Sequence, residues 1–291
     1  MSAIRKTAVL ILTLCLACGL GGAALASTFV DAHGNEIELD DTLQAYAAVT
    51  LNGADKAAYR GETNLGDFWA DALRWFAVSG EINAYFEEDD VAAGITALTV
   101  DADHVVALWN AGNLKTDIPE GVFGAETLAE VLPYPNKVAV VYMTGAQLVE
   151  ALEAASQGLP CTEETGAACA SLMQVSGLRC TVDCTIPYDA GEAYGEHWFT
   201  AASLGRVTVT EVNGQPFDPE AVYAVITSNA NFNGMDSSYV FKAAAEANPE
   251  STITTAVVRD AVWAYIATAL ENQIGADYAE PQGRITLVTA E

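Results

Sequence analysis

The run VVALWNAGNLK, residues 105–115, is the stretch that decides how the chain is interpreted. Its first half is a continuous apolar run of strand-forming residues, which predicts a buried strand. Its second half, from Asn110 to Lys115, is rich in small and amide side chains that are typical of turns. After the loop VLPYPN, residues 131–136, and another apolar run, Thr144 and Gln147 form a capping box that predicts the start of a helix.

Strand and helix patterns alternate on both sides of this stretch. The predicted helices cover residues 64–78, 125–131, 144–156, 237–246 and 254–273. The predicted strands cover residues 104–109, 137–143, 173–182, 206–213, 221–228 and 283–288. Interspersed elements of both kinds predict an α+β (mixed α/β) fold, in which helices cover a mixed sheet. We expect one domain from residue 42 to 288, preceded by a polar leader, residues 27–41, with a small hairpin around Gly34-Asn35.

The first 26 residues are typical of a signal peptide. Arg5 and Lys6 precede an apolar run over residues 8–20, and Ala24-Leu25-Ala26 supplies small residues for cleavage before Ser27. An alternative interpretation makes Cys18 the first residue of a lipoprotein, although Cys15 stands where such sites usually hold an aliphatic residue. No stretch reaches the ~20 apolar residues of a transmembrane helix. We therefore expect an exported protein without a transmembrane segment, located outside the cell, in a periplasm or at the cell surface.

The chain is strongly acidic, with 39 Asp and Glu against 12 Lys and Arg and a formal net charge of −27. Nucleic-acid binding depends on Lys and Arg that neutralise phosphates, so polymeric nucleic acid is not expected as a partner. Dispersed acids of this kind also keep a surface soluble.

Several motifs, in one order, resemble the C-terminal, substrate-recognition domain of the 5'-nucleotidase family. They are GETNLGDF at 61–68, NAGNLK at 110–115, LPYP at 132–135, LMQVSGLR at 172–179, VNGQP at 212–216 and QGRI at 282–285. The resemblance extends from Gly61 to Leu287 and implies the fold of that domain. It also implies a domain that stands alone, without the N-terminal metallophosphatase domain of the family.

The family hydrolyses nucleoside phosphates with two divalent metal ions held in that N-terminal domain, where they activate water and clamp the transferring oxygens. Two segments here superficially resemble its metal motifs, Asp31-Ala32-His33 and the pair Asp67 and Asp71. The first lies in the leader, and the second lies inside a predicted helix, where Asp67 favours the helix N-terminus. We therefore expect no catalytic residue, no metal ligand and no cofactor in this chain.

The resemblance also implies a set of ligand-binding residues. Asn110 matches an asparagine that hydrogen-bonds the ligand, Tyr134 the first aromatic that stacks on the base, and Asp236 the aspartate that contacts the sugar. Lys115 replaces a phosphate-facing arginine, which keeps the charge but loses bidentate geometry. The predicted set is Asn110, Gly112, Lys115, Tyr134, Phe232 and Asp236.

Two positions depart from the family pattern. Ala230 stands at the second stacking position, so Phe232 can serve there only if the loop is rearranged. Tyr59 stands where the family has a second arginine, next to Arg60.

Four cysteines follow the predicted cleavage site: Cys161, Cys169, Cys180 and Cys184. An even number in an exported chain favours disulfides, and the spacing lacks the pairs typical of a zinc site. In an extended strand the α-carbons of Cys180 and Cys184 would lie ~13 Å apart, beyond the ~7 Å limit for a bridge. We favour bridges from the 161–169 loop to Cys180 and Cys184, although three pairings are open.

Three functions from different classes fit these observations. The first is an exported module that recognises a nucleoside or nucleotide in nucleotide catabolism, without catalysis of its own or completing a separate metallophosphatase chain. The second is an active 5'-nucleotidase-like phosphoric ester hydrolase. The third is a disulfide-stapled surface protein that retains only the fold. We favour the first, because the recognition motifs are present and the metal ligands are not.

Overall fold

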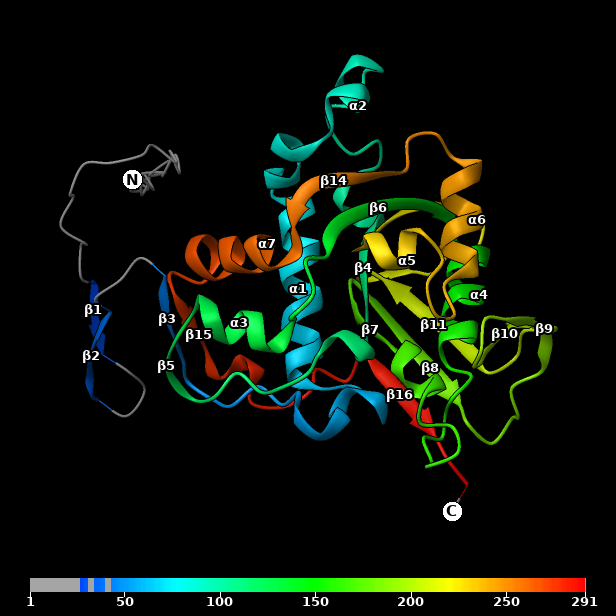
Figure 1. The fold of residues 1–291 in the computed structure, drawn as a ribbon, viewed down its shortest axis with the longest axis horizontal. Coiled ribbons are helices and arrows are strands. Elements are labelled where there is room, and N and C mark those ends of the chain that lie inside the picture. Colours follow the sequence, from blue (N-terminus) through cyan, green and yellow to red (C-terminus); the bar gives the residue numbers. More distant parts are fainter. Residues whose placement is uncertain (1–26, 31–33, 40–42, 291) are drawn as a thin grey trace, which may run out of the picture.

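The computed structural model describes residues 27–30, 34–39 and 43–290 (Figure 1). The predicted signal peptide, residues 1–26, and the Asp31-Ala32-His33 segment lie outside the described residues. Within the described ranges, no helix is both long enough and apolar enough to cross a bilayer.

Two sheets form the main body of the molecule. The larger has the strand order β14-β6-β13-β4-β7, and the second has the order β12-β11-β8-β16. Their strands are β4 (Val105–Asn110), β6 (Lys137–Thr144), β7 (Met173–Ser176), β8 (Leu178–Asp183), β11 (Val207–Val212), β12 (Gln215–Pro216), β13 (Val222–Ser228), β14 (Thr252–Val257) and β16 (Ile285–Val288). Both sheets mix orientations: β13 runs parallel to β4 but antiparallel to β6, and β16 runs parallel to β8.

The central strands of the larger sheet are buried on both faces. Every residue of β4 is buried, as are six of the eight residues of β6. Continuous apolar runs suit strands covered on two sides, and the apolar half of the 105–115 run therefore becomes the middle of the sheet.

The remaining strands of the described residues form three smaller sheets. A three-stranded sheet has the order β15-β3-β5, and β1–β2 and β9–β10 are antiparallel hairpins. Their strands are β1 (Ser27–Val30), β2 (Glu36–Leu39), β3 (Gln44–Ala47), β5 (Gly121–Gly124), β9 (Ala190–Tyr194), β10 (Trp198–Ala201) and β15 (Gln273–Ile274). The β1–β2 hairpin confirms the hairpin predicted in the leader around Gly34, which has a φ of 84°.

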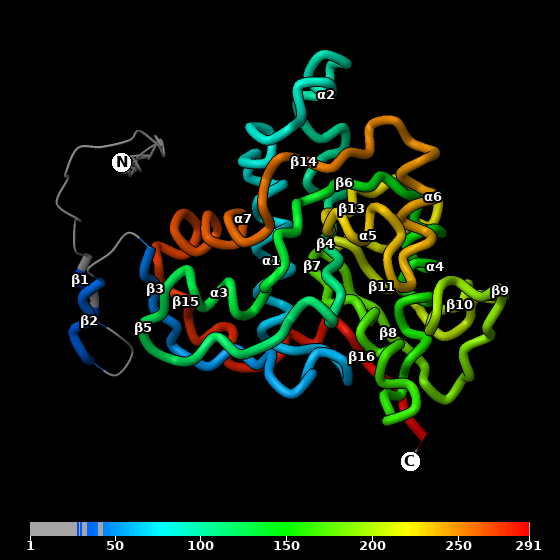
Figure 2. The backbone as a smooth tube through the Cα atoms, in the orientation of Figure 1, coloured from blue at the N-terminus to red at the C-terminus, as the bar shows by residue number. Residues whose placement is uncertain are grey.

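The helices cover the sheets and join them. They are α1 (Asn64–Val78), α2 (Glu88–Ala92), α3 (Ala125–Val131), α4 (Gly145–Ala155), α5 (Asn229–Phe232), α6 (Tyr239–Ala247) and α7 (Val258–Ala264), the last followed by a π-helical turn at Tyr265–Ala269. Helix α1 packs on β4 and β7 and also contacts α7. Figures 1 and 2 show α1 running between the larger sheet and the unit built from β3, β5, β15, α3 and α7. The predicted α+β fold with helices on a mixed sheet is confirmed.

Local capping signals account for the helix starts. The Thr63 hydroxyl accepts a hydrogen bond from Gly66 N at 3.0 Å and begins α1. Thr144 and Gln147 form both hydrogen bonds of the predicted capping box at the start of α4. These bonds satisfy amide groups that a helix leaves unpaired in its first turn.

Two predicted elements differ from the structure. The predicted strand 173–182 is two strands in two sheets, because Gly177, with a φ of 81°, turns the chain between β7 and β8. The predicted helix 254–273 was wrong at its start: residues 252–257 form β14, which pairs with β6. The run TITTAV is rich in β-branched residues and forms the edge strand of the larger sheet, so the helix begins only after it, at Val258.

Candidate functional site

The loop after β4 is held by its own hydrogen bonds. Asn113 Nδ2 donates to Asn110 Oδ1 at 2.7 Å, and Asn110 is only 5% exposed. Gly112 lies close to the chain at Ala170: a Cβ at this position would be 3.1 Å from both the Cβ and the carbonyl oxygen of Ala170. Asn110 and Gly112 therefore shape the loop, and the Asn110 side-chain oxygen is already engaged within it.

Lys115, at the end of this loop, contacts Tyr134. Its Nζ lies 5.5 Å from the centroid of the Tyr134 ring, within the range of a cation–π interaction. The Lys115 amide donates to Val131 O at 3.0 Å, which ties the loop after β4 to the end of α3. The Tyr134 ring is 45% exposed, so it has a face that solvent can reach.

Asp236 lies in the loop between α5 and α6, in a left-handed conformation with a φ of 55°. Burial raises the pKa of its carboxyl, and the charge of Lys115 acts in the opposite direction. The β9–β10 hairpin supports this loop, because the Tyr194 hydroxyl donates to Gly234 O at 2.7 Å. Asp236 thus lies near Lys115, whose ammonium group faces the Tyr134 ring.

Tyr59 completes the cluster from a distant part of the chain. It ends the 3-10 turn Ala54–Tyr59 and is 9% exposed. Burial raises the pKa of its hydroxyl, and the nearby Tyr134 and Asp236 raise it further. Lys56 Nζ lies 5.6 Å from the Tyr59 ring centroid. The sequence marked the position as one that departs from the family pattern, but it gave no sign that the Tyr59 hydroxyl would lie near Tyr134 and Asp236.

The structure therefore brings together three of the six predicted ligand residues, Lys115, Tyr134 and Asp236, and adds Tyr59. We call these four the tyrosine cluster. Phe232 lies at the end of α5 and packs partly buried against the hydrophobic core. No contact joins its ring to another aromatic ring among the described residues.

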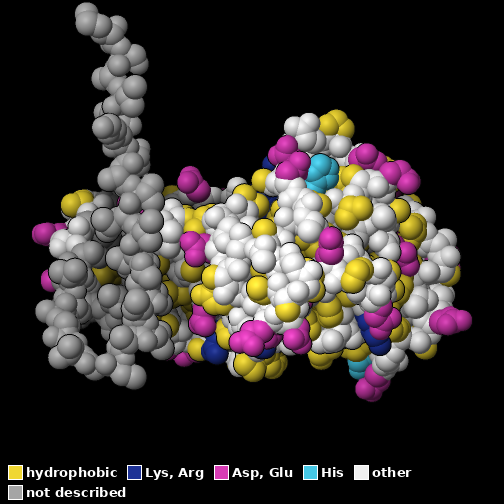
Figure 3. All heavy atoms as spheres, turned by 90° about the horizontal axis from the view of Figure 1, so that it is seen from above, with side chains coloured by type: hydrophobic (Ala, Val, Ile, Leu, Met, Phe, Trp, Pro, Cys, Tyr) yellow, Lys and Arg dark blue, Asp and Glu magenta, His cyan; other side chains and the backbone are white. Residues whose placement is uncertain are grey.

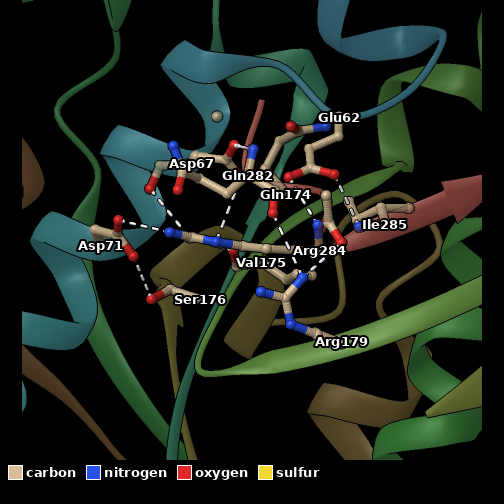
Figure 4. A network of polar contacts seen from close by, with 12 residues as sticks. Glu62, Asp67, Asp71, Gln174, Val175, Ser176, Arg179, Gln282, Arg284 and Ile285 are labelled. Carbon is tan, nitrogen blue, oxygen red and sulfur yellow. Dashed lines mark hydrogen bonds and ion pairs between the residues drawn. The ribbon is translucent and has the colours of Figure 1, made fainter. Parts of the chain in front are cut away.

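Of the two segments that superficially resemble metal motifs, the pair Asp67 and Asp71 lies within the described residues. Within the described ranges, no group of three or more His, Cys, Asp or Glu side chains could hold a metal ion. Asp71 instead binds Arg284 Nη2 at 2.7 Å and accepts hydrogen bonds from Ser176 and Tyr278. Asp67 is fully buried and accepts a hydrogen bond from Gln282 N at 2.8 Å. Figure 4 shows Arg284 lying between the two aspartates of α1.

The predicted cysteine pairing differs from the structure, in which Cys161, Cys169, Cys180 and Cys184 are free thiols. The Cys169 thiol donates to Gly158 O at 3.1 Å, and burial, with a further contribution from the nearby Cys161, raises the pKa of Cys169 to about 12. Cys180 lies within β8, and Cys184 continues its pairing with β16 through a bond to Val288 O. Because this segment is extended, Cys180 and Cys184 lie too far apart to bond to each other, and among the described residues no disulfide joins the 161–169 loop to either of them.

A profile of the 5'-nucleotidase C-terminal domain matches residues 43–246. The chain belongs to this family. The Trifunctional nucleotide phosphoesterase protein YfkN of Bacillus subtilis is 31% identical over 153 residues, which are 52% of this chain and 9% of that protein. An apyrase of Tabanus yao is 24% identical over 208 residues, 72% of this chain and 32% of that protein. The 5'-nucleotidase C-terminal domain thus spans only a part of these relatives.

Solved structures agree with this assignment. A 5'-nucleotidase precursor from Thermus thermophilus superimposes with a TM-score of 0.59 and 26% identity, over 85% of this chain and 39% of that chain. The NAD nucleotidase of Haemophilus influenzae superimposes with a TM-score of 0.56 over 90% of this chain and 48% of that chain. At 14% identity, the second likeness shows the fold of a 5'-nucleotidase C-terminal domain and nothing more.

Proposed function

We propose that this chain is an exported nucleoside- or nucleotide-recognition module in nucleotide catabolism. It hydrolyses no phosphate ester by itself, and it acts alone or completes a separate metallophosphatase chain. The observation that carries the proposal is the tyrosine cluster, in which an exposed aromatic face, a carboxyl group and a lysine converge from separate loops. The family supports the choice of a nucleotide-derived ligand.

Each member of the cluster has a chemical part in this proposal. The accessible Tyr134 face stacks on a base, which is worth ~1 to 3 kcal/mol for any base. Asp236 meets a sugar hydroxyl, and burial raises the pKa of its carboxyl while the charge of Lys115 lowers it. Stacking and a few hydrogen bonds of ~0.5 to 1.5 kcal/mol each give millimolar to high-micromolar affinity after the cost of association.

The ligand's phosphate adds little to this binding. The Lys115 ammonium group already lies 5.5 Å from the Tyr134 ring centroid, and it interacts electrostatically with the Asp236 carboxyl. Asp and Glu are scattered over the face drawn in Figure 3, where Lys and Arg are sparse. A phosphate therefore meets an unfavourable field, as would a nucleic-acid backbone.

Titration of adenosine and AMP by NMR or calorimetry tests the proposal. We expect the two ligands to bind with similar affinity and Tyr134→Ala to weaken both about tenfold, since one stacking face is lost. Tyr85→Ala is a matched control, because Tyr85 is 37% exposed but lies outside the cluster. Tight AMP binding that Tyr134→Ala leaves unchanged would place the ligand elsewhere.

Export and oxidation form one further part of the proposal. Exported protein begins at Ser27, and the oxidising environment outside the cell converts Cys161 and Cys169 to a disulfide, because the two thiols lie near each other. Mass spectrometry of the exported, non-reduced protein measures both features. Lipid attached at Cys18 would contradict cleavage before Ser27. Free thiols at Cys161 and Cys169 would contradict the disulfide.

A further inference from the structure

A cavity of about 260 Å³ lies apart from the tyrosine cluster. Its lining includes Asp71, Arg74, Ser176, Arg179, Glu211 and Arg284. The register of β4 and β7 shows that the cavity and the tyrosine cluster are separate. Ser176, which lines the cavity, pairs with Ala107. Met173 pairs with Asn110, where the loop that leads to Lys115 begins. Three residues of strand correspond to about 10 Å, so the cavity lies toward the other end of the β4–β7 pair.

Three arginines of this acidic chain are concentrated at the cavity, although the whole sequence has only 12 Lys and Arg. Main-chain carbonyl groups hold each of them. Arg74 Nε donates to Val105 O at 2.9 Å, Arg179 Nη1 to Gly283 O at 2.7 Å, and Arg284 Nη1 to Val175 O at 2.9 Å. The three guanidinium groups are therefore fixed before any ligand arrives, which lowers the ordering cost of binding.

Two of these arginines keep donors available. Arg74 uses Nε and Nη2, and Arg179 uses Nε and Nη1, in hydrogen bonds to the protein. Within residues 43–290, no protein acceptor takes a hydrogen bond from Arg74 Nη1 or Arg179 Nη2. The Arg179 side chain is 50% exposed and its partner Glu211 is 42% exposed, so a solute can reach these donors.

The charges at the cavity favour an anion. The cavity lining contains three guanidinium groups and two carboxylates, Asp71 and Glu211, while outside the lining the buried Asp67 lies near Arg284 and Asp103 lies near Arg74. The Asp71 carboxylate is fully occupied by Arg284, Ser176 and Tyr278, as Figure 4 shows in part. Glu211 binds Arg179 through one oxygen only. The local excess of positive charge contrasts with the net charge of −27 for the chain.

Gly177 shapes the wall on which Arg74 lies. A Cβ at this residue would be 2.7 Å from Arg74 Nε and 2.9 Å from Arg74 Cδ. Only glycine lets the guanidinium group lie this close to the turn between β7 and β8, and the turn itself requires the φ of 81°. The same glycine that separates the two strands thus also makes room for the arginine.

We propose that this cavity binds a small oxyanion, a phosphate or a carboxylate, through Arg74 and Arg179. Guanidinium groups present N–H donors in a planar fork that matches the oxygens of both classes. The site is independent of the tyrosine cluster and does not depend on the nucleoside proposal.

The test is titration with inorganic phosphate and, separately, with malonate, at constant ionic strength, with binding followed by NMR of the labelled protein. We expect saturable shifts at residues 176–179 and a loss of affinity of at least about tenfold in Arg179→Gln. Arg179→Lys should recover part of the affinity. Arg259→Gln is the matched control for net charge, because Arg259 lies on α7, away from the cavity lining.

Binding of phosphate alone, of malonate alone or of both supports the site and identifies its ligand class. Shifts that do not saturate, or equal losses in Arg179→Gln and Arg259→Gln, would overturn the proposal. Arg74→Gln is a second variant, and thermal unfolding of Arg179→Gln and Arg74→Gln reports whether each variant folds. Tyr134→Ala should leave anion binding unchanged.

Discussion

At the scale of single residues, burial decides the chemistry of Asp67. It lies in the first turn of α1 and is 0% exposed. Burial raises the pKa of its carboxyl from 3.8 to about 8, against the lowering effect of Arg284. The Arg284 Nε contact, at 3.7 Å, is loose, because Asp71 holds the same guanidinium at 2.7 Å. Burial therefore outweighs the ion pair.

A pH dependence of stability follows from this residue. The folded chain holds a proton on Asp67 that the unfolded chain releases near pH 4, so this contribution to stability is lost as pH rises from about 4 to about 8. Its slope is at most about 1.4 kcal/mol per pH unit. We expect Asp67→Asn, which is neutral and similar in shape, to flatten the decline in urea unfolding between pH 5 and 8.

The control for this experiment is Asp277→Asn, because Asp277 is an exposed aspartate. The free energy of unfolding of Asp277→Asn should decline between pH 5 and 8 as much as that of the wild type. A wild-type stability that rises over this range, with Asp67→Asn lowering it at pH 8, would show that Asp67 is ionised and paired with Arg284.

At the scale of elements, the β9–β10 hairpin positions the loop of Asp236. The Tyr194 hydroxyl reaches Gly234 O, and its ring lies 5.7 Å from the Tyr239 ring. A second tyrosine, Tyr188, bonds within the hairpin to Phe199 O at 2.9 Å. Tyr188 thus stabilises the hairpin itself, whereas Tyr194 joins the hairpin to the loop of Asp236.

Tyr194→Phe removes one hydroxyl and keeps the ring. We expect faster amide hydrogen exchange at Gly234 and Met235 and weaker adenosine binding, with a loss of ~0.5 to 1.5 kcal/mol for one hydrogen bond. Tyr188→Phe should change neither quantity, because its bond stays within the hairpin. Equal effects of the two variants would mean that the hairpin acts only through its own stability.

At the scale of the whole molecule, long-range contacts close the domain around α1. Glu62 accepts hydrogen bonds from the backbone amides of Arg284 and Ile285 at 2.9 Å each, across more than 220 residues of sequence. Figure 4 shows this contact beside the two aspartates. The start of α1 and the last strand therefore form one unit, joined through the Glu62 carboxylate.

From the proposed function we expect the purified protein to release no measurable phosphate from AMP in the presence of Mn²⁺, Co²⁺ or Zn²⁺. Hydrolysis of phosphate monoesters can require accelerations up to ~10²¹, which positioning without metals does not supply. A phosphate-release assay of the purified protein measures this, with each metal omitted as the blank. Metal-dependent turnover that His33→Ala abolishes would place an active site in the leader instead.

Features encoded by neighbouring residues were predictable from the sequence. Helix α1 begins and ends as predicted, since Thr63 caps it locally, and the Thr144–Gln147 capping box starts α4. The apolar run of β4 becomes a buried strand. The family was recognisable from motifs, and with it Lys115, Tyr134 and Asp236, although their ligand is still a proposal.

What only the tertiary structure decided concerns residues far apart in the chain. Tyr59 joins Tyr134, β14 pairs with β6 instead of extending a helix, and Arg74, Arg179 and Arg284 meet at one cavity. Capping boxes and apolar runs act within a few residues and can be read directly. Side-chain direction, burial and pKa depend on which distant strands pack together, and no local pattern encodes that choice.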